Sequence, residues 1–176
     1  LIKIGGMPLI YYTINASQKS DVEETWLSTD SSKIKEIALK YGCKVVGNKN
    51  DANRIPGIDI LLEEGDQLSI GTSVCSILEV SGHTNGHISY FFEKDFALFC
   101  GDTLFSLGCG RLFEGTPSQM VRSLKKIRSL PEDTKIYCAH EYTEANSRFA
   151  NHLTPDDSLL KKKIIEIKEK RSNNIP

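Results

Sequence analysis

The sequence predicts a mixed α/β (α+β) domain, and three features of the chain support this class. Residues 7–42 show a helix, strand, helix pattern, residues 58–100 contain successive short β-segments, and residues 116–171 are mostly helical. With 39% apolar and 26% charged residues, the 176-residue chain has the composition of a folded globular protein. Its length fits one domain, or one domain plus a fragment, and disordered or fibrous classes are excluded.

The N-terminal part is predicted to contain two helices. Pro8 stands near the start of the first helix, Ser32 is a suitable N-cap for the second, and Gly42 ends the second. Pro56 and Gly57 stop regular structure. The expected elements are, in order, helix 7–18, strand 26–30, helix 33–41, strand 43–47 and loop 48–57.

The remainder is predicted to form a sheet followed by helices. Thr116 caps the first of these helices, with Pro117 at its first position and an apolar stripe that Pro131 ends. The members of this stripe are Met120, Leu124, Ile127 and Leu130. The expected strands are 58–63, 67–70, 73–80, 88–93, 96–100 and 134–138, and the last two helices are 143–153 and 158–171.

Charge and hydropathy exclude some classes of binding partner. A net charge of −1 and a pI near 6.5 give no field that attracts nucleic acid or an anionic membrane, so the expected partner is a small molecule. The chain has no apolar run long enough for a transmembrane helix and no pattern of a signal peptide, which predicts a cytoplasmic protein. Five cysteines without a CxxC pair are expected to be reduced and mostly buried.

Three potential metal ligands each follow a predicted strand. His83 follows strand 73–80, Asp102 follows strand 96–100, and His140 follows strand 134–138. Strand ends that share one edge of a sheet bring such side chains together on a rigid scaffold. Imidazole and carboxylate are ligands of zinc, iron or manganese, and a carboxylate can bridge two cations roughly 3.5 to 4 Å apart. Asp102 is the expected bridge, and the chemistry would be hydrolytic.

The other histidines are interpreted more simply. His152 is taken as a surface residue. His87 lies four residues after His83, a spacing that pairs ligands on a helix but not clearly on this glycine-flanked turn. A histidine on a loop is in general more often hydrogen-bonded or exposed than bound to a metal, so residue types alone leave the metal site open.

Four blocks of the sequence resemble hydroxyacylglutathione hydrolase (glyoxalase II). The blocks are NDANRIPGIDILLEEGD, GHTNGHISYFF, ALFCGDTLFSLGCGRLFEGT and LPEDTKIYCAHEYTEANSRFA, in the order of that family. The resemblance covers about residues 43–176. It implies a metallo-β-lactamase αββα sandwich, incomplete in this chain, with a dinuclear zinc or iron/zinc centre. It also implies hydrolysis of S-lactoylglutathione to D-lactate and glutathione.

The resemblance assigns roles residue by residue. His83 would bind one metal, His140 the other, and Asp102 both, which makes Asp102 the catalytic residue. Substrate contacts with glutathione are expected from Arg111, Phe113 and Tyr142. A guanidinium holds a carboxylate with two hydrogen bonds, whereas Phe113 lacks the hydroxyl of the family's tyrosine, so a lower affinity is expected.

Two parts of the family pattern are missing. The motif THxHxDH, which supplies the remaining ligands, is absent, since all four histidines lie at position 83 or later. The basic helical tail of full-length relatives is absent after residue 176. Residues 1–42 resemble instead a fragment of an acylneuraminate cytidylyltransferase (CMP-sialic acid synthetase), as in MPLIYYTI and LSTDS, so a foreign helix, strand, helix segment is expected to join near residues 41–46.

Three hypotheses about function stay open. The chain is a metal-dependent thioester hydrolase, or an inactive chimeric or truncated remnant with residual glutathione or metal binding. A nucleotide-sugar cytidylyltransferase fragment is the third, although its glycine-rich phosphate loop is lacking. Because half of the family's sheet would be missing, we also expect an uncovered sheet face that favours self-association.

Overall fold

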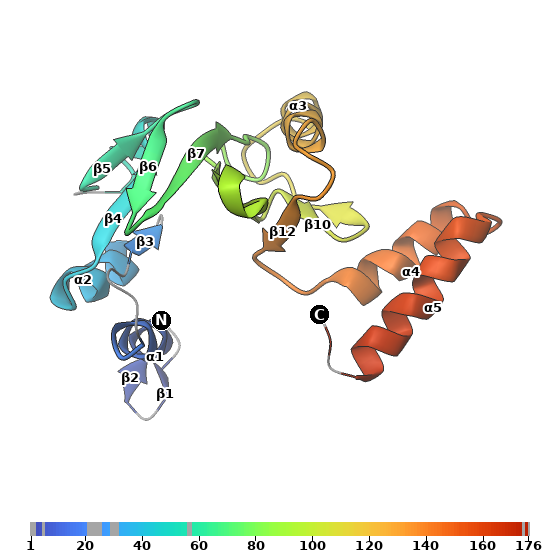
Figure 1. Ribbon diagram of the computed structural model, residues 1–176, viewed down its shortest axis with the longest axis horizontal. Helices are drawn as coiled ribbons and strands as arrows, with labels where there is room; N and C mark the ends of the chain where they lie inside the picture. Colours follow the sequence, from blue (N-terminus) through green and yellow to red (C-terminus); the bar gives the residue numbers. More distant parts are fainter. Residues whose placement is uncertain are drawn as a thin grey trace. The chain divides into compact units, whose positions relative to one another are not determined.

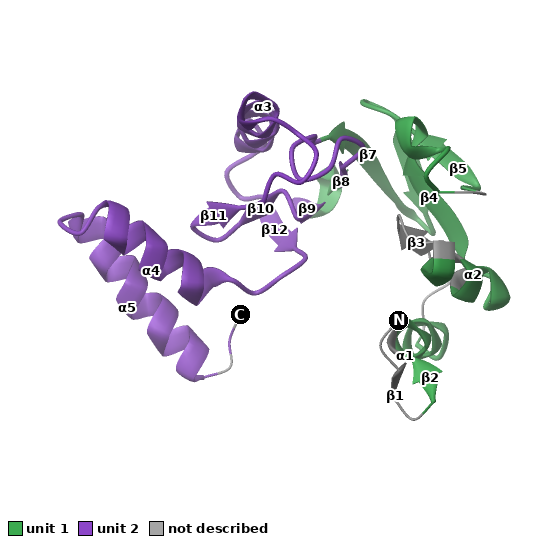
Figure 2. Cartoon of the chain, turned by 180° about the vertical axis from the view of Figure 1, so that it is seen from behind, with its two compact units in different colours: residues 1–79, 90–95 green, residues 80–89, 96–176 purple. Residues whose placement is uncertain are grey.

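The computed structural model describes residues 3–4, 6–20, 26–28, 32–55, 58–173 and 175, and the chain divides into two compact units (Figure 1, Figure 2). Unit 1 comprises residues 1–79 and 90–95. Unit 2 comprises residues 80–89 and 96–176. All the candidate site residues belong to unit 2, so the site is described within that unit.

Unit 1 contains helices, a parallel sheet and a β-hairpin. Its elements are β1 (Lys3–Ile4), β2 (Met7–Pro8), α1 (Leu9–Gln18), β3 (Trp26–Ser28), α2 (Ser32–Lys40), β4 (Lys44–Asn48), η1 (Lys49–Asp51), β5 (Ile60–Leu62), β6 (Gln67–Ile70), β7 (Ser73–Glu79) and η2 (Glu93–Asp95). Strands β3, β4 and β5 are parallel, with Trp26 opposite Lys44 and Val46 opposite Ile60. Strands β6 and β7 are antiparallel.

The segments on the two sides of Gly42 share a core. Ile14 of α1 and Cys43 are both buried, and Ile10, Ile37 and Tyr41 pack against them. Gly42 has a φ of +71°, a conformation that glycine adopts without strain, which allows the chain to leave α2 and enter β4. Residues 1–42 therefore supply β3 and two helices to the same compact unit as residues 43–79, while their separate ancestry stays a prediction.

In its described residues, unit 2 contains short strands and three helices. Its elements are β9 (Ala97–Gly101), β10 (Leu104–Phe105), β11 (Gly108–Cys109), α3 (Pro117–Arg128), β12 (Lys135–Cys138), α4 (Thr143–Leu153) and α5 (Ser158–Ser172). Strand β8 (Ile88–Phe92) is divided between the units after Ser89, and the sheet that contains it has the order β12-β9-β8-β7-β6. On β9, Leu98 and Cys100 are fully buried whereas Phe99 is exposed, the alternation expected of a half-buried strand.

Helix α3 begins as predicted. Thr116 and Gln119 form a capping box, and Pro117 occupies the first turn, where its missing N–H costs no hydrogen bond. The prediction that Leu130 belongs to the apolar stripe of this helix is wrong, because the helix ends at Arg128 and Ser129 is its C-cap. Helices α4 and α5 lie side by side as an antiparallel pair (Figure 1).

Other boundaries differ by one or two residues from prediction. Helix α2 begins at Ser32 itself, and α1 begins after Pro8. Thr29, Asp30, Pro56 and Gly57, to which the predictions assigned a strand end and a loop, lie outside the described residues. No helix in the described ranges has the length and apolar character needed to cross a membrane.

Apolar side chains are exposed on the sheet and on the last two helices. Phe99 and Tyr137 stack at 4.8 Å on the parallel strands β9 and β12, and each is almost half exposed. On α4 and α5, Phe149 and Leu159 are more than half exposed. Uncovered apolar surface of this kind favours association.

We therefore expect the purified chain to elute from a size-exclusion column as a species larger than a monomer, with the share of that species rising with protein concentration. Replacing Phe149 and Leu159 by serine should shift the elution toward the monomer because both side chains are exposed. A monomer at all concentrations would contradict the expectation.

Candidate metal centre

Three loops of unit 2 bring the candidate ligands together. His83 lies in the loop of residues 80–87, Asp102 directly follows β9, and His140 follows β12 by two residues. Because β9 and β12 are parallel neighbours, Asp102 and His140 leave the sheet at the same edge. The amide of Ala139 donates to the carbonyl oxygen of Gly101 at 3.0 Å, which joins the two strand ends.

The carboxylate of Asp102 stands between the two imidazoles. Its Oδ2 lies 3.8 Å from Nε2 of His83, and its Oδ1 lies 3.2 Å from Nε2 of His140. The side chains of His83, Asp102 and His140 are 17%, 26% and 49% exposed, so the group is partly open to solvent. The predicted convergence of these three side chains is thus present, with one carboxylate oxygen facing each imidazole.

The orientation of His83 is determined by a backbone atom. Its Nδ1 lies 2.7 Å from the carbonyl oxygen of Arg111, an atom that can only accept, so Nδ1 carries the hydrogen and donates. The Nε2 atom that faces Asp102 then has a free lone pair. Metal-binding histidines usually donate their other ring N–H in this way, which fixes the ring and its tautomer.

The three side chains are of the types that bind zinc, iron or manganese. At 3.8 Å the lone pair of His83 Nε2 and an oxygen of Asp102 face each other without a hydrogen between them, as two ligands of one cation do. No group of three or more His, Cys, Asp or Glu side chains in the described residues could hold a metal ion by itself. Each histidine, together with the Asp102 oxygen that faces it, offers two donor atoms. Zinc in proteins commonly has four ligands.

Aromatic and basic side chains flank the carboxylate on both sides. The ring of Phe113 packs edge-on against His83 at 4.9 Å, and the guanidinium of Arg111 lies 5.8 Å from the centre of the Phe113 ring. Tyr142 stacks on His140, with ring centres 4.9 Å apart and planes within 15°. The three predicted substrate contacts are therefore adjacent to the candidate ligands, and Arg111, Phe113 and Tyr142 are all exposed.

The segment 110–115 holds the His83 loop in place. Phe113 and Gly115 donate backbone hydrogen bonds to the carbonyl oxygens of His83 and Gly82, and the amide of Asn85 donates to the carboxylate of Glu114 at 2.9 Å. Gly110 also donates to the carbonyl oxygen of Thr103 at 3.2 Å. These contacts link the loops of His83 and Asp102, and nothing in the residue types predicted them.

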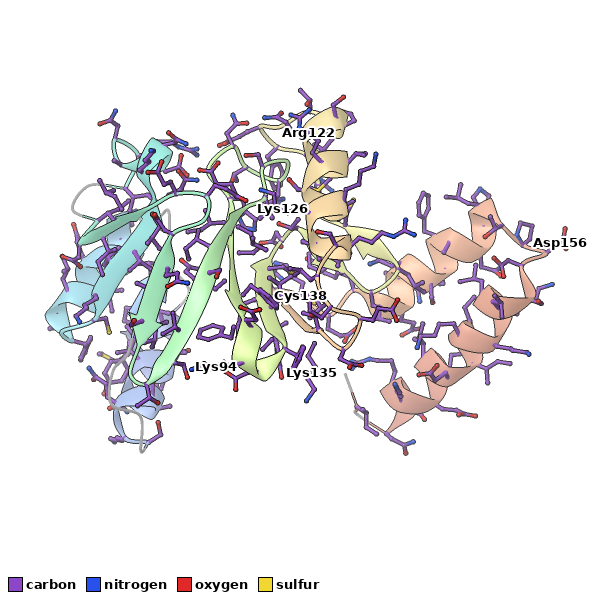
Figure 3. All side chains as sticks on the ribbon, turned by 45° about the horizontal axis from the view of Figure 1, so that its top comes forward. Lys94, Arg122, Lys126, Lys135, Cys138 and Asp156 are labelled. Atoms are coloured by element: carbon purple, nitrogen blue, oxygen red, sulfur yellow. The ribbon has the colours of Figure 1, made fainter. Side chains whose placement is uncertain are left out.

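The five cysteines are free, as predicted, and three of them are buried. Burial raises the pKa of the Cys43, Cys75 and Cys100 thiols above the usual value. Cys138, at the end of β12 (Figure 3), and Cys109 are exposed. A raised pKa leaves less thiolate at a given pH, so the three buried thiols should react more slowly than the exposed Cys109 and Cys138.

At about pH 8, near the ordinary pKa of a thiol, we expect iodoacetamide to modify Cys109 and Cys138 in the native chain well before the three buried thiols. Peptide mass spectrometry at successive times would give the order. The same reaction in urea should modify all five at similar rates, and early modification of Cys100 in the native chain would contradict the fold around β9.

Comparison with known protein families identifies the class of protein to which this fold belongs. The family model of the metallo-beta-lactamase superfamily matches residues 9–140, and the chain belongs to this superfamily. The predicted fold is thereby confirmed. The match begins at residue 9 and so includes most of the N-terminal segment.

The more specific relatives are hydroxyacylglutathione hydrolases. The chain is 50% identical over 136 residues to the hydroxyacylglutathione hydrolase of Methylococcus capsulatus, covering 77% of this chain and 53% of the relative. It is 51% identical over 142 residues to that of Pelagibacter ubique, covering 81% and 59%. The chain thus spans just over half the length of these curated relatives.

Solved structures agree on the fold. The structure of ETHE1 from Myxococcus xanthus superposes with a TM-score of 0.65 at 26% identity, covering 76% of this chain and 61% of that one. TTHA1623 in a di-iron-bound form gives a TM-score of 0.63 at 21% identity, covering 78% and 83%.

Proposed function

We propose that the chain contributes to a metal-dependent hydrolase of glutathione thioesters, of the hydroxyacylglutathione hydrolase type. One observation carries the proposal: the two carboxylate oxygens of Asp102 face the Nε2 atoms of His83 and His140 on opposite sides. A carboxylate that bridges two cations has this arrangement of donors. The identity to curated hydroxyacylglutathione hydrolases supports the substrate class.

In this proposal His83 and one oxygen of Asp102 hold the first ion, while His140 and the other oxygen hold the second. Zinc, or iron with zinc, suits imidazole and carboxylate donors. When bound, such ions lower the pKa of water toward neutrality and polarise a carbonyl group. Asp102 would have the central role, because its negative charge would screen the repulsion between two ions and each of its oxygens faces one of the two imidazoles.

The substrate contacts follow from the flanking side chains. Glutathione carries carboxylates, and the exposed guanidinium of Arg111 can hold one of them with two hydrogen bonds. Phe113 and Tyr142 offer apolar ring faces on the two sides of the carboxylate. In the overall reaction water adds to the thioester carbonyl, the carbon–sulfur bond breaks, and a hydroxy acid and the glutathione thiol are released.

A second candidate is a protein that binds the ions or glutathione without turnover. The observation that favours it is the small donor set, since residues 1–82 contain no histidine and three side chains are divided between two ions. Incomplete metal shells lower affinity and leave the reacting water without a fixed position. The alternative keeps the same site and differs only in activity.

The test combines metal analysis with a hydrolysis assay. The full chain is equilibrated with zinc, freed of excess ion, and measured for zinc per chain and for hydrolysis of S-lactoylglutathione. Close to two ions per chain with hydrolysis supports the proposed function, and ions without hydrolysis support the alternative. If the chain shows neither bound zinc nor hydrolysis, the proposed function and the ion-binding form of the alternative are both refuted. His152→Ala serves as a control for the loss of a histidine outside the site.

A substitution at Phe113 tests the substrate side. We expect Phe113→Tyr to lower the KM for S-lactoylglutathione about fivefold, because a new hydroxyl can donate one hydrogen bond worth about 1 kcal/mol. The turnover number should change little. Initial rates over a range of substrate concentrations give both constants, and an unchanged or higher KM would remove Phe113 from the substrate site.

The ancestry and location of the chain complete the proposal. Residues 1–42 derive from a cytidylyltransferase and join the hydrolase part near residues 41–46. Sequencing the gene from source DNA across these codons would check this, because an uninterrupted hydrolase gene would reveal an assembly error. We also propose that the protein is located in the cytoplasm. Cell fractionation would check this location.

A further inference from the structure

A histidine outside the ligand set contacts the main chain of Asp102. The Nε2 atom of His87 lies 3.1 Å from the backbone nitrogen of Asp102 and 3.3 Å from the carbonyl oxygen of Cys100. The His87 ring is half-buried, and its centre lies 5.8 Å from that of His83 at a steep interplanar angle of 67°. No pattern of residues predicted that this ring lies beside Asp102.

The two contacts require opposite roles of the Nε2 atom of His87: it accepts from the amide of Asp102 if it carries no hydrogen, and it donates to the carbonyl oxygen of Cys100 if it carries one. The backbone N–H of Asp102 can only donate, so that contact requires a Nε2 atom without hydrogen. The carbonyl oxygen of Cys100 accepts a hydrogen bond from the amide of Thr103 at 3.2 Å, so it has a donor without the His87 ring. The amide of Asp102 donates to Nε2 at 3.1 Å, which makes Nε2 the acceptor and assigns the hydrogen of the neutral ring to Nδ1.

Gly101 makes this contact possible. Its φ of +54° lies in the left-handed region, which turns the chain sharply between β9 and Asp102. A Cβ at this position would lie 2.7 Å from Nε2 of His87, too close for any side chain. The missing side chain thus leaves the space in which the imidazole meets the Asp102 amide.

The His87 contact also joins two ligand loops. The carbonyl oxygen of His87 accepts from the amide of Val80 at 2.9 Å and closes the base of the loop that carries His83. Its ring reaches the loop of Asp102, whose preceding residue accepts from Ala139 beside His140. One side chain therefore connects the His83 loop to a position that is itself tied to the His140 loop.

We propose that His87 is a positioning residue: its Nε2 accepts the amide hydrogen of Asp102 and so holds the carboxylate between the imidazoles of His83 and His140. The inference rests on the proposed two-ion site and deepens it. His87 touches neither ion nor substrate in this role. It acts through the main chain of Asp102.

Two variants separate the hydrogen bond from the packing of the ring. His87→Phe keeps an aromatic ring and removes the acceptor, whereas His87→Gln keeps an acceptor oxygen close to the position of Nε2. Removing a residue that orients a ligand typically weakens metal binding about 10- to 100-fold. We expect this loss in His87→Phe, with His87→Gln closer to the native chain, in chelator competition for zinc.

A second measurement needs no metal. Long-range proton–nitrogen NMR spectra of the metal-free chain at about pH 8, where imidazole is neutral, identify the tautomer of each histidine. The inference expects the hydrogen of His87 on Nδ1 and an Asp102 amide whose signal moves in His87→Phe. His152→Ala provides the control spectrum and assigns the signal of the fourth histidine.

The outcomes separate the inference from the proposed function. A His87 hydrogen on Nε2 would overturn the inference, as would equal zinc affinity of His87→Phe and the native chain at equal thermal stability. If the native chain binds no zinc, the proposed function fails, and the tautomer and the Asp102 amide still decide the role of His87.

Discussion

Asp102→Asn is expected to abolish binding of zinc at both positions and, with it, any hydrolysis of the thioester. The substitution preserves the shape of the side chain but removes the negative charge and one of the two acceptor oxygens. Both imidazoles lose their partner, because Oδ1 and Oδ2 face different histidines. Since loss of a residue that only orients a ligand weakens binding about 10- to 100-fold, loss of the shared ligand should exceed about 100-fold.

The measurement is zinc affinity by chelator competition, together with the initial rate on S-lactoylglutathione. Asp156→Asn is the matched control, because it makes the same change at an exposed residue between α4 and α5 (Figure 3). The control should keep native affinity. If Asp102→Asn keeps an affinity within a few fold of the native chain, Asp102 does not bridge two ions.

Single substitutions of the two imidazoles refine the same expectation. His83→Ala and His140→Ala should each remove one ion, because each ring faces only one oxygen of Asp102. The chain would then bind about one zinc ion instead of two. This difference between the histidines and Asp102 follows because the carboxylate presents one oxygen to each ring, whereas each imidazole presents one nitrogen to Asp102.

Regular elements with a local signal could be predicted from the sequence. Strand β6 has the predicted bounds, and the start of α3 follows from a capping box with proline in the first turn. Strands β1, β2, β10 and β11 have two residues each, too few for a periodic pattern, so they could not be predicted from the sequence. The end of α3 was misjudged because Leu130 continues the apolar spacing after the C-cap at Ser129.

The positions of the candidate ligands could be predicted, but the contacts that orient them could not. His83, Asp102 and His140 each follow a strand, and that position is visible in the sequence. The hydrogen bond that orients His83 ends on the backbone carbonyl of Arg111, 28 residues away, and any residue type at position 111 would supply this atom. Contacts through the main chain leave no signature in residue types, and the same holds for the contact of His87 with the amide of Asp102.

The interpretation of residues 1–42 shows a different limit. Their sequence resembles another family. Strand β3 nevertheless pairs in parallel with β4, and α1 packs against Cys43, so the segment is part of the core of unit 1. A sheet accepts any strand whose backbone hydrogen bonds and apolar face fit the neighbouring strand. The packing of residues 1–42 in unit 1 therefore follows from backbone pairing and apolar fit, whatever the ancestry of the segment.

Gly110→Ala is expected to separate the loops of the site and to destabilise unit 2. Gly110 is buried, and a Cβ there would overlap the carbonyl oxygen of Asp102 and lie 3.3 Å from Nδ1 of His83. The obstacle is backbone, which cannot move as the end of a flexible side chain can. The added methyl must therefore displace Asp102 from His83, at an overpacking cost of about 1–3 kcal/mol.

Urea denaturation would measure the loss in free energy of unfolding, and chelator competition would measure the loss of zinc affinity. Gly108→Ala is the matched control, because its added methyl meets the side-chain amide of Asn146, which can move aside. The control gives up at most the hydrogen bond from Asn146 to the carbonyl oxygen of Ser106, worth about 1 kcal/mol, and should keep native zinc affinity. Equal zinc affinity in Gly110→Ala and Gly108→Ala would show that segment 110–115 does not hold the ligand loops in register, because the close approach of Gly110 to Asp102 would then have no effect on the site.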